Sequence, residues 1–292
     1  MRPLPLADPR IVAVGDNVVD CYTADGVMYP GGNCVNVSVY AAREGVETSY
    51  IGAVAEDTAG DLLRSALRAE NVDTTRLRVE DGSTAYCRIG LVDGDRVFLN
   101  SGKGVSLFTP SEADLDFIAG YDALHVGDSS FLDAHVPDFA RRTRVSYDFS
   151  IRTQPEFWHP LVSHCFLATF SGGDLDEAQV DELIAGALAG GATWVLVTRG
   201  SRGAVLTDGA QRASSTPVPT QVVDTLGAGD TLTARVLIGL LRGEDLGTLM
   251  AAASASAAVT CTQFGAFGYG APIDITETSP RTDDLLTEGE LR

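Results

Sequence analysis

Positive charge is scarce in this sequence of 292 residues. Lysine and arginine number 21 against 40 aspartates and glutamates, the formal net charge is −19, and Lys103 is the single lysine. Such an acidic chain repels phosphate backbones and anionic lipids, which argues against a nucleic acid or a membrane surface as partner. No apolar run reaches membrane-spanning length, and Met1–Arg10 is proline-rich rather than a signal peptide. We therefore expect a cytoplasmic protein.

Cysteine and histidine are also sparse. The cysteines are odd in number, scattered and without a C-x-x-C pair, so we expect reduced thiols rather than disulfides or a zinc site. They are Cys21, Cys34, Cys87, Cys165 and Cys261. The histidines show no metal-ligand spacing, and we interpret each as a structural or surface residue. They are His125, His135, His159 and His164.

Short apolar runs alternate with segments of helical periodicity along most of the chain. Strands are expected at 11–14, 49–54, 121–126, 144–149, 165–168, 193–198 and 204–207, and helices at 59–70, 131–141 and 175–189. This alternation predicts an α/β fold, with a mainly parallel, doubly wound sheet covered by helices on both faces. Segment 271–292 is acidic with little apolar periodicity, so we expect a loose tail there.

A hairpin interrupts this alternation. Segments 84–91 and 96–100 flank Asp93-Gly94, a dipeptide typical of hairpin turns. We expect a small sheet standing apart from the main one. Arg88 and Phe98 on these strands are either substrate contacts or ordinary sheet surface.

The most informative stretch is Val222–Gly239, where a glycine-containing loop leads into an amphipathic helix. Glycines allow backbone N–H groups to approach a bulky anion, and a helix N-terminus favours negative charge. A carboxylate such as Asp230 is repelled by a neighbouring polyphosphate. Its presence there makes sense if it acts as the base that takes the proton of an attacking hydroxyl. The alternative is a simple turn in which Asp230 caps the helix.

Two segments carry a family resemblance. Asp224–Asp230 (DTLGAGD) and Gly31–Tyr40 (GGNCVNVSVY) resemble the two signatures of the ribokinase-like (PfkB) carbohydrate kinases. GDNVVD at Gly15–Asp20, YPGGNCVNVSVYA at Tyr29–Ala41 and YDFS at Tyr147–Ser150 are similar to the fructoselysine 6-kinase branch. The resemblance spans about residues 11–270. It implies one three-layer α/β/α domain over 1–270, with a β-sheet lid from about 17–32 and 84–105.

The resemblance also implies the site residues. Asp230 would be the base, and the N–H groups of Gly227, Ala228 and Gly229 would stabilise the transferred phosphoryl group. The expected sugar contacts are Asp16, Asn17, Asp20, Gly31, Gly32, Asn33 and Asn36. From the residues alone, the alternative is that one of Asp16, Asn17 and Asp20 caps a turn. The expected nucleotide contacts are Thr198, Arg199, Gly200, Gly203, Thr225, Gly227, Gly229 and Ser254.

The sequence departs from the family where magnesium is concerned. The Asn-x-x-Glu motif that many relatives carry is replaced by TFSGGDLDEAQ at Thr169–Gln179, which leaves Asp174 and Glu177 as weak metal candidates. Ser150 stands where many relatives have asparagine.

The resemblance predicts transfer of the ATP γ-phosphoryl group, with Mg²⁺, to the 6-hydroxyl of a fructosamine such as fructoselysine. The residues alone indicate a polyol with a primary hydroxyl, so a fructokinase, a ribokinase-type or a nucleoside kinase stays open. A non-catalytic sugar or nucleotide sensor is the alternative from another class. A dehydrogenase is set aside because no G-x-G-x-x-G follows the first strand. We also expect a homodimer paired through the lid.

Overall fold

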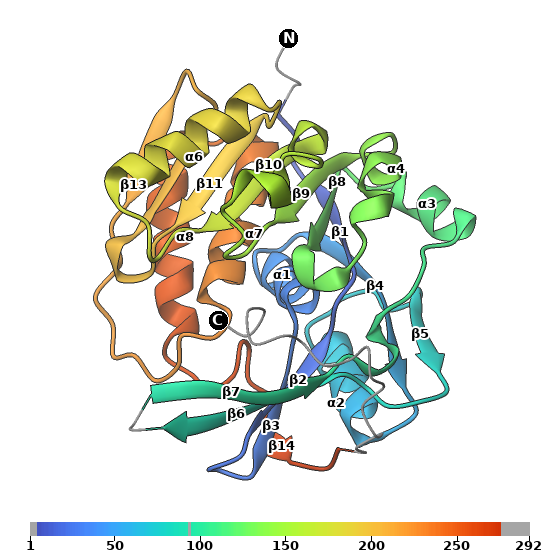
Figure 1. Ribbon diagram of the computed structural model, residues 1–292. Coiled ribbons are helices and arrows are strands. Elements are labelled where there is room, and N and C mark those ends of the chain that lie inside the picture. Colours follow the sequence, from blue (N-terminus) through green and yellow to red (C-terminus); the bar gives the residue numbers. More distant parts are fainter. Residues whose placement is uncertain (1–4, 93–94, 276–292) are drawn as a thin grey trace.

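The computed structural model describes residues 5–92 and 95–275, and it does not describe the side chains of residues 91–98. In this part of the chain a nine-stranded sheet forms the middle layer (Figure 1). Its order is β13 (Arg212–Ser215), β12 (Ala204–Thr207), β11 (Trp194–Thr198), β10 (Cys165–Ser171), β9 (Arg144–Asp148), β8 (Ala123–Gly127), β1 (Arg10–Val14), β4 (Glu47–Ala55) and β5 (Leu77–Glu80). Neighbouring strands pair parallel except near one edge, where β12 pairs antiparallel with both β11 and β13.

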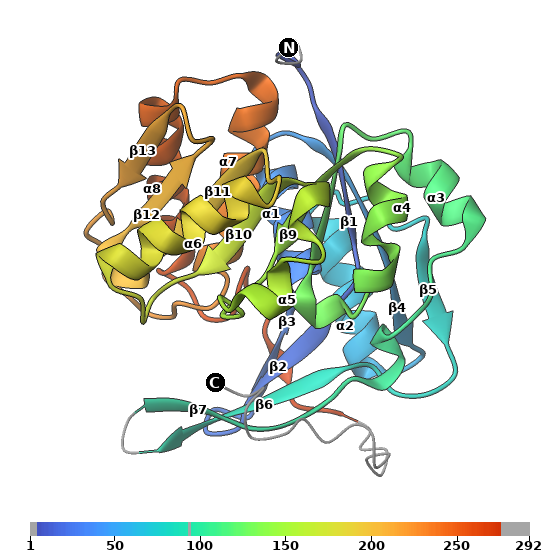
Figure 2. The ribbon, with the colours of Figure 1, turned by 45° about the horizontal axis from the view of Figure 1, so that its top comes forward.

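Helices cover both faces because side chains alternate along the buried strands. On β1, Ile11 and Ala13 pack toward one face, and Val12 and Val14 toward the other. The first face carries α1 (Asn33–Arg43), α2 (Thr58–Ala69), α7 (Ala228–Arg242) and α8 (Leu246–Thr260). The second carries α3 (Glu112–Ile118), α4 (Val136–Ala140), α5 (Pro155–Trp158) and α6 (Glu177–Ala189), and Figure 2 shows α3, α4 and α6 in front of the sheet.

A second, smaller sheet stands beside the first, at the bottom of Figure 1. Its order is β14 (Ala271–Pro272), β3 (Val27–Gly31), β2 (Val18–Tyr22), β6 (Tyr86–Val92) and β7 (Asp95–Gly102). The chain enters it directly from β1 and returns from β3 into α1. The second sheet therefore borders the N-terminus of α1.

The predicted α/β fold and its separate small sheet are confirmed. The helical segment expected at 131–141 is present as η3 (Asp133–His135) followed directly by α4. One local expectation is wrong. Ala271–Pro272 pairs with β3 rather than starting a loose tail, and residues 276–292 lie outside the described residues. Within the described ranges, no helix has the length and apolar character needed to cross a membrane.

Candidate active site

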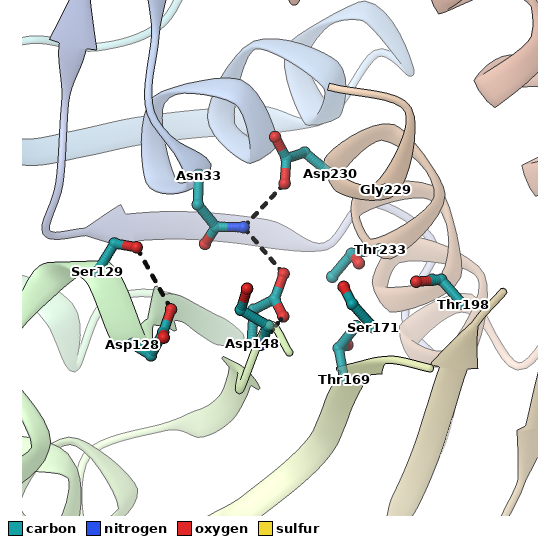
Figure 3. Close-up of a pocket in the computed structure, with 11 residues that line it drawn as sticks. Asn33, Asp128, Ser129, Asp148, Thr169, Ser171, Thr198, Gly229, Asp230 and Thr233 are labelled. Atoms are coloured by element: carbon teal, nitrogen blue, oxygen red, sulfur yellow. Dashed lines mark hydrogen bonds between the residues drawn. The ribbon is translucent and has the colours of Figure 1, made fainter. Parts of the chain in front are cut away.

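A cavity of about 180 Å³ lies at the edge of the large sheet where the parallel strands end (Figure 3). The chain runs outward from β1 through β4 and β5, and then returns to β8 on the other side. The cavity is thus at the switch point where open α/β sheets bind ligands. It is lined by Asn33, Asp128, Ser129, Asp148, Ser150, Thr169, Ser171, Thr198, Gly229, Asp230 and Thr233.

Asp230 is in the first turn of α7 and lines this cavity. Its two carboxylate oxygens accept hydrogen bonds from side-chain amides of α1: Asn33 Nδ2 at 2.9 Å and Asn36 Nδ2 at 2.6 Å. Burial raises the pKa of Asp230 to about 6, although these two amides oppose the rise. The carboxylate is therefore ionised at neutral pH and held in one orientation.

The glycines before Asp230 have different roles. Gly227 is the N-cap residue with a φ of 80°, and a Cβ there would lie 2.8 Å from the Ala266 Cβ, so no larger residue fits. A Cβ on Gly229 would meet no atom within 4 Å, so the space beside it is open to the cavity. The N–H of Ala228 donates to the Thr225 carbonyl at 3.2 Å, and its expected role toward a phosphoryl group stays a prediction.

Asp224, the first residue of the signature, fixes the loop. Its carboxylate accepts hydrogen bonds from the N–H of Leu226 at 2.9 Å, the N–H of Gly265 at 3.0 Å and the Tyr22 hydroxyl at 2.5 Å. Because Tyr22 belongs to β2, Asp224 ties the loop before α7 to the second sheet. The neighbouring Thr225 is exposed and does not line the cavity.

Two cavity carboxylates were missed by the sequence analysis. Asp148 accepts from Asn33 Nδ2 at 3.0 Å and from the Ser150 N–H at 2.8 Å, and burial followed by the charge of Asp230 raises its pKa to about 7. Asp128 forms an ion pair with Arg152 at 3.1 Å. Asp148 ends β9 and Asp128 directly follows β8. Ligands bind at the carboxyl ends of the strands in open α/β sheets, and applying this rule to β8 and β9 would have identified Asp128 and Asp148.

Asp16 and Asn17 hold the scaffold. The Asp16 carboxylate accepts from the N–H of Asn33 at 2.8 Å and from the Ser130 hydroxyl at 3.0 Å, so it caps the start of α1. The Asn17 amide donates to the Tyr50 hydroxyl at 3.0 Å and to the Ala53 carbonyl at 2.8 Å, which fixes β4. Both side chains are thus engaged within the scaffold, and their expected sugar contacts stay predictions.

Asp20, on β2, is different because within the described residues no hydrogen bond reaches its carboxylate. The residue is only 5% exposed, and burial followed by the charges of Asp224 and Asp230 raises its pKa to about 7. Gly31 makes room for it, since a Cβ there would lie 2.4 Å from Asp20 Oδ2. Gly32, with a φ of 105°, passes so close to Asn17 that a Cβ would lie 2.7 Å from its Cα.

Of the two predicted contacts from the hairpin, Arg88 does not join Asp20. Arg88 pairs in register with Cys21, so the alternation of the pleat places it on the opposite face of β2 and β6 from Asp20. The side chain of Phe98 lies outside the described residues.

Of the expected nucleotide residues at the end of β11 and in the turn that follows it, Thr198 lines the cavity and Arg199, Gly200 and Gly203 do not. Arg199 is 7% exposed and donates to Glu177 at 2.6 Å, so it supports a loop rather than facing the cavity. Gly200 and Gly203 form the turn around η5 (Gly200–Arg202). On α8, the Ser254 hydroxyl donates to the Thr216 carbonyl at 2.7 Å.

The weak metal candidates also lie elsewhere. Asp174 and Glu177 are exposed, and neither lines the cavity. Within residues 5–92 and 95–275, no group of three or more histidine, cysteine, aspartate or glutamate side chains is arranged to hold a metal ion. A metal here would need ligands from a bound molecule as well as from the protein.

The chain is similar in sequence and fold to known sugar kinases. The chain is 38% identical to the fructosamine kinase FrlD of Bacillus subtilis (strain 168), over 90% of this chain and 94% of that protein. It is 35% identical to the fructoselysine 6-kinase of Escherichia coli (strain K12), over 88% of this chain and 99% of that one. The solved structure of Arabidopsis thaliana ribokinase complexed with ribose and ATP has a TM-score of 0.77 at 20% identity, covering 89% and 95% of the two chains, which confirms the ribokinase-like fold.

The family profile described as pfkB family carbohydrate kinase matches residues 8–143 and 164–272. These ranges include both signature segments, Asp230 and the other cavity residues of α7, and Asp128 and Ser129 after β8. The chain therefore belongs to the pfkB family of carbohydrate kinases.

Proposed function

We propose that this protein is an ATP-dependent kinase that phosphorylates the 6-hydroxyl of a fructosamine such as fructoselysine. The observation that carries this proposal is the carboxylate of Asp230, held by two amides at a helix N-terminus and facing a cavity. The substrate class rests on the names of the relatives at 35–38% identity. A net charge of −19 is compatible with an amine-bearing substrate.

Asp230 would take the proton of the attacking hydroxyl. As the sugar oxygen bonds to the γ-phosphorus, the bond from that phosphorus to the bridging oxygen of ADP breaks, and the hydroxyl proton passes to Asp230. Asn33 and Asn36 fix the direction in which the carboxylate accepts. The open space beside Gly229 lets the phosphoryl group approach the first turn of α7, whose N–H groups lack intrahelical partners.

The sugar would lie between the second sheet and Asp230. Asp20 is the best acceptor for its hydroxyls, because the carboxylate is buried and no described hydrogen bond uses it. The second sheet would act as the lid that keeps water from the transferred group. The nucleotide would lie on the other side of Asp230, near Thr198 and Gly229.

The cavity residues also fit magnesium. Mg²⁺ is commonly held by one or two carboxylates together with substrate phosphates, and Asp128 and Asp148 line the cavity with Asp230. The hydroxyls of Thr169 and Thr233 also line it, and both are buried without a hydrogen-bond partner among the described residues. When bound, the ion would neutralise charge on the phosphates. These residues replace Asp174 and Glu177 as our proposed metal side of the site.

The test is ADP release from the purified protein with fructosamines, fructose, ribose and nucleosides. We expect fructosamines to give the highest kcat/KM, and the highest value with another sugar or a nucleoside would identify a different kinase. Asp230→Asn should lower kcat by about 10²–10⁴, with sugar binding retained. Asp174→Asn, an exposed carboxylate away from the cavity, is the matched control. No ADP with any acceptor would favour the sensor.

Pairing of two copies through the second sheet and a cytoplasmic location remain predictions. Gel filtration of the purified protein tests the first. A mass of one chain, about 30.7 kDa, would contradict the homodimer.

A further inference from the structure

The side-chain amide of Asn33 joins three ionisable groups. Its Nδ2 donates to Asp230 at 2.9 Å and to Asp148 at 3.0 Å, as the dashed lines in Figure 3 show. Its Oδ1 lies 2.8 Å from Nε2 of His125. The carboxylate of Asp230 is ionised at neutral pH and can only accept, so the NH₂ group must face it and the oxygen must face the histidine.

This orientation determines the state of His125. The residue is 0% exposed on β8, and burial lowers its pKa to about 3, so the ring is neutral. A neutral ring has one N–H, and Asn33 Oδ1 can only accept, so the proton is on Nε2. Nδ1 then accepts from the Ser146 hydroxyl at 3.0 Å. One directed chain of hydrogen bonds thus runs from Ser146 on β9 through His125 and Asn33 to the carboxylates of Asp148 and Asp230.

We propose that His125 and Asn33 form a positioning pair that orients the base Asp230, an inference that rests on the proposed function. The Nε2–H of His125 holds the Asn33 oxygen, and this contact keeps the amide from turning over. A turned amide would point its oxygen at Asp148 and Asp230, and acceptor would face acceptor in a buried site. Asp230 would then keep only the Asn36 donor, and its direction toward the attacking hydroxyl would be lost.

The competing explanation is that His125 only fills the core. Two variants distinguish this structural role from the positioning role. His125→Leu removes both ring contacts, whereas His125→Gln keeps an amide N–H near the position of Nε2. Both variants lose the acceptor for Ser146, so a purely structural role predicts similar losses of kcat in the two. We expect His125→Leu to lower kcat about 10- to 100-fold, the effect of losing one hydrogen bond to a charged group, with KM for both substrates unchanged. His125→Gln should recover most of it.

A second measurement does not depend on catalysis or on the variants folding. Long-range ¹H–¹⁵N correlation spectra of the wild-type protein labelled at histidine should show His125 as the neutral Nε2–H form from about pH 5.5 to 8.5. An Nδ1–H or a charged ring would overturn the proposal, as would equal losses of kcat in the Leu and Gln variants or no loss in the Leu variant. If the wild type phosphorylates no acceptor, the proposed function fails. The spectra would still decide whether His125 donates to Asn33.

Discussion

Gly229→Ala should separate the stability of α7 from its function. Gly229 is the second residue of the helix, its φ is not positive, and an added methyl would meet no protein atom within 4 Å. Alanine is favoured over glycine in helices by up to about 1 kcal/mol, so the variant should be at least as stable as the wild type. The same methyl would enter the cavity beside the carboxylate of Asp230. A reacting group displaced by about 1 Å loses roughly 100-fold in rate.

Gly247→Ala is the matched control. Gly247 is the second residue of α8, is exposed, and its Cβ would make only an ordinary contact of 3.4 Å with Asp245. Thermal unfolding and ADP release should be measured for both variants. We expect both to keep their Tm, and only Gly229→Ala to lose about 100-fold in kcat/KM for ATP. A value within threefold of the wild type would refute phosphoryl binding at this helix start.

Three further predictions concern charge. The pKa of Asp230 is raised to about 6, and the base must be ionised to act. We therefore expect kcat/KM to fall about tenfold per pH unit below pH 6, whereas an ordinary aspartate would give this fall only below about pH 4. Folding raises the pKa of Asp20 to about 7, so the folded state binds the proton of this carboxyl more tightly than the unfolded state. The resulting contribution to the free energy of unfolding is complete below the unfolded pKa and is lost as the pH rises through 7. Asp20→Asn should therefore be more stable than the wild type at pH 8, by up to about 4 kcal/mol, but not near pH 4, and an equal Tm difference at both values would contradict this. Asp128→Asn should weaken the Mg²⁺ dependence of ATP binding about tenfold by calorimetry, and Asp174→Asn should not, whereas equal effects would remove Asp128 from the metal side of the site.

Local patterns in the sequence were enough for the fold and for the helix start that carries Asp230. Apolar runs marked the strands because a strand buried on both faces admits few polar residues. The glycines before Asp230 indicated the start of a helix, and Gly227 is indeed the N-cap residue of α7, with a positive φ that favours glycine. Gly31 and Gly32 marked the entry into α1, where an added Cβ would clash with Asp20 or Asn17.

Tertiary structure decided which polar residues share the cavity. Asp16 and Asp20 are four residues apart, yet one caps α1 and the other is buried without a described partner, because the chain passes from the large sheet into the second sheet between them. His125, Asp148 and Asp230 come from β8, β9 and α7, and they meet only through the amide of Asn33. No periodicity or spacing encodes such a meeting. It depends on the order in which the strands pair and on the direction of each side chain once they have packed.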